Sequence, residues 1–489
     1  MFAFPACART CSPIRLQLMK FPGLFLLPLL LLCGLFFPVC PSAPAAEATA
    51  PARRPNFVFV LTDDMRWNVL GCMGDRMVRT PAIDALAAQG VLFSNHFCTT
   101  SICCVSRASI LSGQYARRHG IGDFSTPFTP EQWARTWPAL LRQAGYRTGF
   151  IGKFGVGDAK AIQAKAEAFD FWRGEPGQGG EWFIAPGDPT RTHTTARDGD
   201  QALEFLEGCD AGKPFCLSIS FNAPHARDGK PREFQPDLRD ESLYTGTLIP
   251  EPPTADDAFF QRLPDFVRES EGRRRWERRF ATDEMFQTTM RDYYRLITGL
   301  DREVGRIVEE LKKRGLADHT VIVFTSDNGW AAGDRGLADK WFPYEESTRL
   351  PLVVFDPRLP EAARGRTCGA MTLNIDFAPT FLTMAGLPVP EGMQGCDLTP
   401  LLAGQAPADW RTEFFYEHHF GPKIIPPSEG VRTLRWSYLR WLAPNPEQEE
   451  LYDLDADPLE SKNLAADPAH ADTLQSLRAA RMRYLETLK

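Results

Sequence analysis

Two short apolar runs, far apart in the chain, each end abruptly in acidic or amide side chains. Residues 56–61 (NFVFVL) lead to Asp63 and Asp64, and residues 320–326 (TVIVFTS) lead to Asp327 and Asn328. Uninterrupted β-branched and aromatic runs of this length are typical of strands buried on both faces. Strands of this kind form parallel sheets covered by helices, so the two runs predict an α/β fold.

Amphipathic helical patterns lie between and around these runs, and most of them are closed by glycine. The predicted helices cover residues 80–89, 137–144 and 292–313, and a further strand is expected near residues 146–153. We therefore expect a large, mixed and mostly parallel sheet flanked by helices. Ligands of such sheets bind outside the carboxyl ends of the strands, where the acidic groups lie here.

The chain divides into three parts by composition. Lys20, an apolar run over residues 21–39 and small residues before position 46 predict a signal peptide over residues 1–46, with Met19 as an alternative start. An uncleaved membrane anchor is the alternative, because the run is almost long enough to span a bilayer. Residues 53–405 are the predicted main α/β domain, and residues 409–489 a smaller α+β subdomain.

Charge and cysteine content narrow the function classes. The 489 residues carry a net charge of −7, which argues against general nucleic-acid binding because that requires a broad basic surface. In an exported protein, proximity makes Cys209/Cys216 and Cys368/Cys396 plausible disulfide pairs, although spacing does not fix connectivity. No C-x-x-C pair supports a structural zinc site.

The acidic strand ends predict a cation site. Hard divalent cations require several oxygen ligands close together, and Asp63, Asp64, Asp327 and Asn328 supply them if the two strands are neighbours. A turn or a helix cap is the alternative reading of a single Asp-Asp pair. Two such clusters at two strand ends favour the cation.

A cysteine pair precedes a short helical segment. Cys103 stands four residues before Arg107 in CCVSRASILSG, which puts a nucleophile at a helix N-terminus with a cation one turn away. That setting lowers a thiol pKa. A thiolate is still a poor companion for oxygen ligands, so the motif implies a modified cysteine.

These motifs together resemble the sulfatase family. CCVSRASILSG is similar to the family motif C-x-P-S-R-x-x-x-L-T-G. Five further blocks and the C-terminal LYDLDADPLESKNLA resemble family segments in the same order: TDD at 62–64, GYRTGFIGK ending at Lys153, NAPH ending at His225, TSDNG at 325–329 and DKWFPYEESTRLPL from Asp339. The resemblance covers roughly residues 54–465.

The resemblance implies a sulfatase that hydrolyses sulfate monoesters, on a sulfated carbohydrate, with calcium. In the family the motif cysteine, here Cys103, is oxidised to formylglycine, whose hydrate attacks sulfur. The implied metal ligands are Asp63, Asp64, Cys103, Asp327 and Asn328. The implied cationic groups around the sulfate are Arg107, Lys153, His225 and Lys340, with His225 or Lys340 protonating the departing alcohol.

Two positions depart from the family pattern. Val105 replaces the usual Pro or Ala, which bears on recognition by the formylglycine-generating enzyme, the expected maturation partner. Gly155 replaces the histidine of G-K-W-H, a general base for the second step. His119 and His193 are alternative bases. His418, His419 and Arg432 lie where relatives build the substrate rim.

Other functions remain open at this level. A phosphonate or phosphodiester hydrolase of the same alkaline-phosphatase-like superfamily is one alternative, and a non-catalytic sulfated-glycan binding protein is another. Residues 225–290 are expected to form a surface insertion whose basic run, residues 273–279, is a solvated helix face or a contact for a sulfated polymer. Export to the periplasm or medium, without stable membrane association after cleavage, is the expected localisation.

Overall fold

The computed structural model describes residues 53–178, 181–183, 192–443 and 446–488, so the predicted signal peptide lies outside the described residues. A nine-stranded sheet forms the centre, in the order β10-β2-β9-β6-β1-β5-β3-β4, with β11 also paired to β2. Only β9 runs antiparallel to its neighbours β2 and β6, which confirms the predicted mixed, mostly parallel sheet. The strands are β1 (Asn56–Thr62), β2 (Val91–Phe97), β3 (Arg147–Lys153), β4 (Phe171–Glu175), β5 (Phe215–Ser220), β6 (Thr320–Ser326), β9 (Arg349–Phe355), β10 (Arg366–Cys368) and β11 (Thr372–Leu373).

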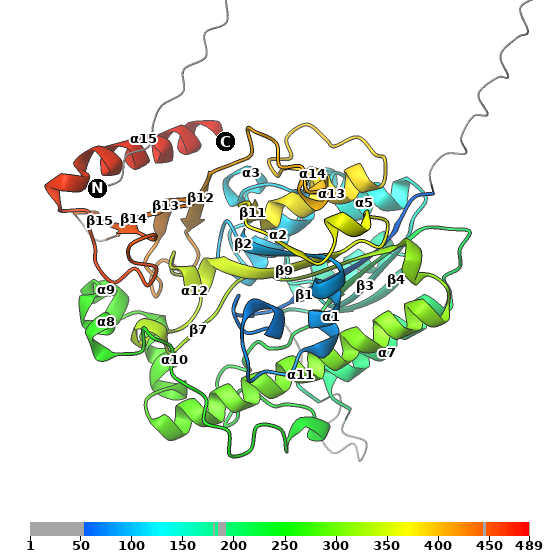
Figure 1. The fold of residues 1–489 in the computed structure, drawn as a ribbon, viewed down its shortest axis with the longest axis horizontal. Coiled ribbons are helices and arrows are strands. Elements are labelled where there is room, and N and C mark those ends of the chain that lie inside the picture. The colour runs from blue at the N-terminus through cyan, green and yellow to red at the C-terminus, as the bar shows by residue number, and fades with distance from the viewer. Residues whose placement is uncertain (1–52, 179–180, 184–191, 444–445, 489) are drawn as a thin grey trace, which may run out of the picture. The chain divides into compact units, whose positions relative to one another are not determined.

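Helices cover both faces of the sheet (Figure 1). Strand β1 carries apolar side chains on both of its faces, and each set packs under helices. Side chains alternate between faces along a strand. Val58 and Val60 pack into one apolar core with α1 (Pro81–Gln89), α7 (Thr194–Glu207) and α11 (Asp283–Lys313). Phe57, Phe59 and Leu61 pack into a second core with α2 (Cys103–Ser112), α5 (Trp137–Gln143) and α13 (Phe377–Met384). The uninterrupted apolar run is thus explained by burial on both faces.

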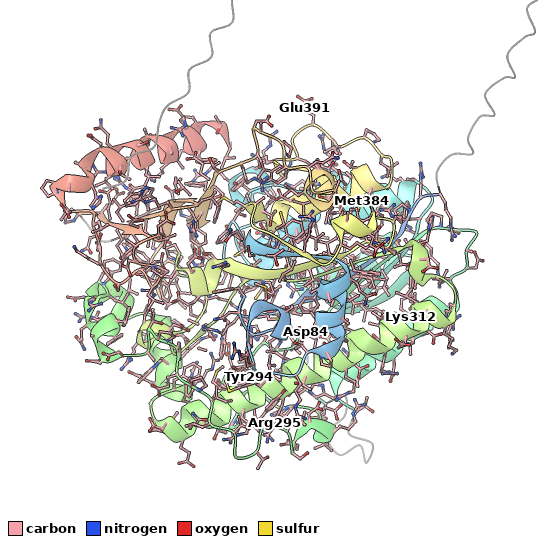
Figure 2. All side chains as sticks on the ribbon, in the orientation of Figure 1. Asp84, Tyr294, Arg295, Lys312, Met384 and Glu391 are labelled. Atoms are coloured by element: carbon pink, nitrogen blue, oxygen red, sulfur yellow. The ribbon has the colours of Figure 1, made fainter. Side chains whose placement is uncertain are left out.

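The α11 helix begins earlier than the sequence pattern indicated. Thr282 caps its first turn by accepting a hydrogen bond from the Met285 amide, at 3.2 Å. Its faces differ as expected for a covering helix: Tyr294 is buried and donates to Asp75, whereas Lys312 is largely exposed (Figure 2). Shorter α-helices elsewhere around the central sheet are α3 (Ala116–His119), α4 (Pro130–Ala134), α6 (Ala159–Gln163), α12 (Glu345–Thr348) and α14 (Thr399–Leu402).

A second, four-stranded antiparallel sheet follows towards the C-terminus. Its strands, in the order β12-β13-β14-β15, are packed against the terminal helix α15 (Figure 1). This agrees with the predicted smaller α+β unit. The elements are β12 (Glu413–His418), β13 (Ser428–Thr433), β14 (Trp436–Trp441), β15 (Gln448–Asp453) and α15 (Ala471–Thr487).

The segment between β5 and α11 contains three short α-helices: α8 (Asp257–Arg262), α9 (Asp265–Arg268) and α10 (Glu271–Arg279). The prediction that the basic run of α10 is a solvated face is wrong for half of the helix. Arg279 is buried and Arg275 is mostly buried, because both form ion pairs with Asp339. Arg274 and Arg278, which point to another side of the helix, are open to solvent.

Neither of the two cysteine pairs that proximity made plausible forms a disulfide, since all four cysteines are free. Cys216 in β5 packs into the core that contains Phe57, whereas Cys209 packs against the core on the other face of the sheet. Proximity in sequence therefore does not bring these two sulfur atoms together. Among the described residues, no helix has both the length and the apolar composition needed to cross a membrane.

Candidate active site

The two acidic strand ends meet at one edge of the central sheet. β1 and β6 pair in parallel with Thr62 opposite Ser326, so the residues that follow emerge side by side. The Asp327 amide donates to the Thr62 carbonyl at 3.0 Å, and the Asn328 side-chain amide donates to Asp64 Oδ1 at 2.5 Å. Asp63, Asp64, Asp327 and Asn328 are all buried. The sheet register thus assembles the predicted oxygen cluster.

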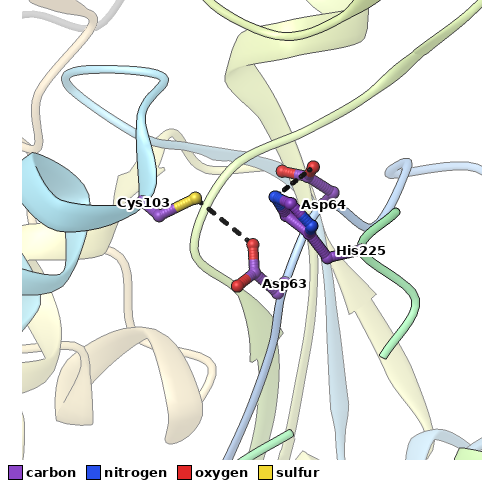
Figure 3. Close-up of side chains that lie close together, drawn as sticks. All are labelled: Asp63, Asp64, Cys103 and His225. Atoms are coloured by element: carbon purple, nitrogen blue, oxygen red, sulfur yellow. Dashed lines mark hydrogen bonds and ion pairs between the residues drawn. The ribbon is translucent and has the colours of Figure 1, made fainter. Parts of the chain in front are cut away.

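Cys103 faces this cluster from the first residue of α2 (Figure 3). Its thiol donates a hydrogen bond to Asp63 Oδ1 at 3.3 Å. One turn later, Ser106 donates to the Asp327 carbonyl and accepts from the Asn374 side chain, which fixes the start of the helix against β6. The nucleophile candidate therefore lies at a helix N-terminus, directly beside the strand ends.

Four basic groups surround the acidic cluster. Arg107 pairs with Asp327 at 2.8 Å and with Asp63 at 3.2 Å, and Lys153 pairs with Asp63 at 2.5 Å. Lys340 contacts Asp64 and donates to Cys103 Sγ at 3.1 Å. His225 Nε2 lies 3.4 Å from Asp64 Oδ2 (Figure 3). Every residue that the motifs singled out as catalytic or metal-binding thus lies in one cluster.

Electrostatics of the cluster differ from the sequence expectation at Cys103. Burial and the adjacent Asp63 raise the thiol pKa well above its ordinary value, and Lys153 and Lys340 do not offset them. The expectation of a lowered thiol pKa is therefore wrong. Burial beside a carboxylate raises the pKa by more than the helix N-terminus and the two lysines lower it. An unmodified Cys103 is protonated, and a protonated thiol is a poor nucleophile.

The carboxylates and lysines of the cluster hold opposite charges. Burial alone would raise the pKa of Asp63, but Lys153, His225 and Arg107 hold it well below its ordinary value. Burial, reinforced by Asp63, raises the pKa of Asp327 to about 6. Burial disfavours the charge of Lys340, yet Asp64 and its neighbours keep the lysine pKa well above its ordinary value.

Comparison with known proteins shows the family to which the chain belongs. The family model described as Sulfatase matches residues 55–387, and the model described as N-sulphoglucosamine sulphohydrolase, C-terminal, matches residues 333–487. The chain belongs to the sulfatase family. It is accordingly a sulfuric ester hydrolase.

Individual sulfatases are similar along most of the chain. An N-acetylglucosamine-6-O-sulfatase of Bacteroides thetaiotaomicron is 30% identical over 526 residues, covering 93% of this chain and 89% of that protein. A solved structure in complex with its substrate D-glucosamine-2-N,6-O-disulfate superposes with a TM-score of 0.74 at 27% identity, covering 89% of this chain and 98% of the other. A phosphonate monoester hydrolase of Agrobacterium radiobacter reaches a TM-score of 0.75 at 24% identity, over 89% and 96% of the two chains, and shares the fold.

Gly155 leaves no room for the histidine that the sulfatase family usually carries there. Its φ is +75°, and a Cβ at this position would lie 2.8 Å from Arg107 Cδ. Gln178 lies against the same glycine: its amide donates to the Gly155 carbonyl at 3.2 Å. The buried Oε1 of Gln178 has no hydrogen-bond partner among the described residues. Gln178 was not predicted, because no motif contains it.

The alternative bases, His119 and His193, are both engaged in structural hydrogen bonds. His119 Nε2 lies 3.0 Å from Ser109 Oγ, and its Nδ1 accepts from the Ile121 amide. His193 caps α7, and its Nε2 lies 2.9 Å from the Gln235 carbonyl oxygen. In this sulfatase neither imidazole has a ring nitrogen available for a reacting group.

The three candidate rim residues lie in different environments. His418 is fully buried, and its Nε2 lies 3.1 Å from the Phe420 carbonyl oxygen. Arg432 pairs with Glu345 at 2.8 Å. Only His419 is exposed; it lines a cavity of about 370 Å³ together with Val105 of α2 and residues of α3, β12 and β13. Of the three, His419 alone is open to a ligand in this structure.

Proposed function

We propose that this sulfatase removes sulfate from a sulfated carbohydrate, and that a sulfated glucosamine is the first substrate to test. Support comes from the relatives: one is named N-acetylglucosamine-6-O-sulfatase, and another was solved with D-glucosamine-2-N,6-O-disulfate as its substrate. The observation that carries the proposal is the cluster itself, in which a nucleophile position faces carboxylates and fixed cations.

The proposed nucleophile is formylglycine at position 103, made from the cysteine by a formylglycine-generating enzyme. The hydrated aldehyde supplies an oxygen nucleophile for attack at sulfur, which the protonated and buried thiol does not. An oxygen at this position also matches the donor set of Asp63 and Asp64 better than sulfur does. Val105 does not belong to the charged cluster, so its effect on maturation is a separate question.

We propose calcium as the metal, held by Asp63, Asp64, Asp327 and Asn328 with residue 103. The donor set fits a hard cation: all four side chains offer oxygen, and the buried Asn328 Oδ1 has no hydrogen-bond partner among the described residues. The ion would polarise the groups bound to it. Asp63, Asp64, Cys103 and His225 already place ligand atoms within 4.8 Å of one another.

The chain's own cations prepare the site for an anionic substrate. Asp63, Asp64 and Asp327 are balanced by Arg107, Lys153 and Lys340, all buried. A divalent cation added to this balanced set leaves an excess of positive charge, which attracts a sulfate ester and stabilises charge developing on its oxygens. His225 and Lys340 both face Asp64, and either can donate a proton to the departing alcohol.

Release of inorganic sulfate from glucosamine 6-sulfate tests the proposal, with a phosphonate monoester assayed in parallel. Turnover of the sulfate ester that is lost in the Cys103→Ala variant is the expected result. Preferred turnover of the phosphonate would favour the related phosphonate hydrolases, and binding of the sugar without turnover would favour a glycan-binding protein.

We also propose that the protein is exported, by the predicted signal peptide at residues 1–46. For the mature chain, we propose residues 53–405 as the catalytic domain and residues 409–489 as the C-terminal subdomain. His419 is proposed as a contact for the sugar because it is exposed beside the cavity next to α2. We expect no nucleic-acid partner, since the net charge is −7.

A further inference from the structure

Two arginines of α10 form ion pairs with one buried carboxylate, that of Asp339. Arg275 and Arg279 are four residues apart, so they lie on the same face of the helix. Arg275 pairs with Asp339 Oδ2 and Arg279 with Asp339 Oδ1. Trp330 donates a third contact to Oδ1, at 2.9 Å. Asp339 is 1% exposed, so these side chains, and not water, stabilise its negative charge.

Asp339 directly precedes Lys340, the lysine that contacts Asp64 and Cys103. The backbone is left-handed on both sides of this lysine, with φ of +72° at Asp339 and +87° at Trp341. Residues other than glycine adopt this conformation only when surrounding contacts impose it. α10 supplies such contacts on both sides of Lys340. Before the lysine, the two arginines hold Asp339. After it, Gly272 packs so closely on Phe342 that a Cβ at position 272 would lie 2.7 Å from the ring.

The same arginines reach the segment that follows His225. Arg279 pairs with Asp228 at 2.6 Å and with Glu233 at 2.5 Å, and Arg275 pairs with Asp228 at 2.9 Å. α10 thus links the segments that carry two cationic groups of the active site. Residues of α10, which lies outside the motifs that resemble the sulfatase family, therefore contact both segments.

We propose that Arg275 and Arg279 are positioning residues that act through Asp339 to hold Lys340 against Asp64. Without the arginines, Asp339 would be a buried and unbalanced carboxylate next to Lys340. It would then compete with Asp64 for the lysine ammonium group. This inference rests on the role of Lys340 in the proposed function, and the experiment separates the two.

The experiment is a double-mutant cycle between Asp339→Asn and Lys340→Ala, measured on folded enzyme as kcat/KM for sulfate release from glucosamine 6-sulfate, whose alcohol leaving group needs a proton. In the wild-type background Asp339→Asn should lower kcat/KM about 100-fold, because the neutral amide loses the ion pairs to Arg275 and Arg279 that keep the neighbouring Lys340 in place. In the Lys340→Ala background it should lower it less than about three-fold, because the group that it positions is already absent. A role confined to stability would lower the melting temperature and leave kcat/KM of the folded enzyme unchanged.

A second cycle combines Arg275→Gln with Lys340→Ala, and it tests the same coupling if Asp339→Asn does not fold. Arg275→Lys should recover part of the loss because it keeps the charge. Arg274→Gln is the matched control: its side chain is 61% exposed and does not pair with Asp339, so we expect no change beyond two-fold. Equal losses of kcat/KM in the wild-type and Lys340→Ala backgrounds would overturn this inference and leave the proposed function standing. Full turnover by Lys340→Ala would overturn the proposed role of Lys340 and, with it, the inference.

Discussion

Cys103 and Cys104 are adjacent in sequence but lie in different surroundings. Cys103 contacts Asp63 and Lys340, whereas Cys104 packs among apolar side chains such as Val105 and Trp341. Only the first can act on a substrate held by the charged cluster. The motif spacing to Arg107 had selected the same residue.

Replacement of each cysteine separates chemistry from packing. Cys103→Ala should lower kcat by at least about 10³-fold, because a covalent nucleophile is lost. Cys104→Ala should keep kcat within about three-fold and reduce the free energy of unfolding by about 1 kcal/mol. Steady-state kinetics and urea denaturation measure the two effects. Loss of turnover in Cys104→Ala but not in Cys103→Ala would move the nucleophile by one residue.

Gly155 offers a second residue-level prediction, with Gly177 as its control. Both glycines have φ near +75°, so alanine strains either backbone by about 1 kcal/mol. At Gly155 the added Cβ also meets Arg107 Cδ at 2.8 Å, while at Gly177 nothing lies within 4 Å. Gly155→Ala should therefore displace Arg107 and lower kcat/KM at least about ten-fold. Gly177→Ala should lower stability only; equal kinetic effects of the two variants would count against this reading.

At the scale of elements, buried strands were predictable and ion-pair partners were not. Continuous apolar runs fix β1 and β6 locally, and their parallel pairing brings the predicted carboxylates together. The buried face of α10 depends on Asp339, which is 60 positions from Arg279. A local pattern of arginines looks the same whether the partner is a carboxylate or water. The Gln178 contact with Gly155 was missed for the same reason.

Helix α7 contains a buried carboxylate whose titration should affect stability. Burial raises the pKa of Asp198 to about 7, although Arg197 opposes the shift. The folded protein then binds this proton more tightly than the unfolded chain, whose value is near 3.8. The stability contributed by protonation is complete below pH 4 and is lost as the pH rises to 7, with a slope of at most about 1.4 kcal/mol per pH unit.

Asp198→Asn isolates this contribution. The free energy of unfolding should fall less between pH 4 and 7 in the variant than in the wild type, when both are measured by chemical denaturation. Parallel pH profiles for the two proteins would show that Asp198 titrates at its ordinary pKa. Turnover should be the same in both proteins, because the polar contacts of Asp198 among the described residues go to Arg197 and not to the active-site cluster.

At the scale of the whole molecule, the proposed calcium ion should stabilise the fold as well as the site. A ligand that binds only the folded protein adds about 2.7 kcal/mol at a concentration 100 times its Kd. Chelation should therefore lower the melting temperature by several degrees, and calcium should restore both stability and turnover. Asp327→Ala should abolish the calcium-dependent shift and remain folded. Full activity in metal-free protein would contradict the metal assignment.

The central claim is that residue 103 is a formylglycine in the active enzyme. The tryptic peptide of residues 80–107 contains it, and mass spectrometry of protein purified from its native host distinguishes –CHO from –CH₂SH at that position. The account predicts the aldehyde at Cys103 and an unmodified thiol at Cys104, in a preparation that releases sulfate. An unmodified thiol at Cys103 in fully active enzyme would contradict it.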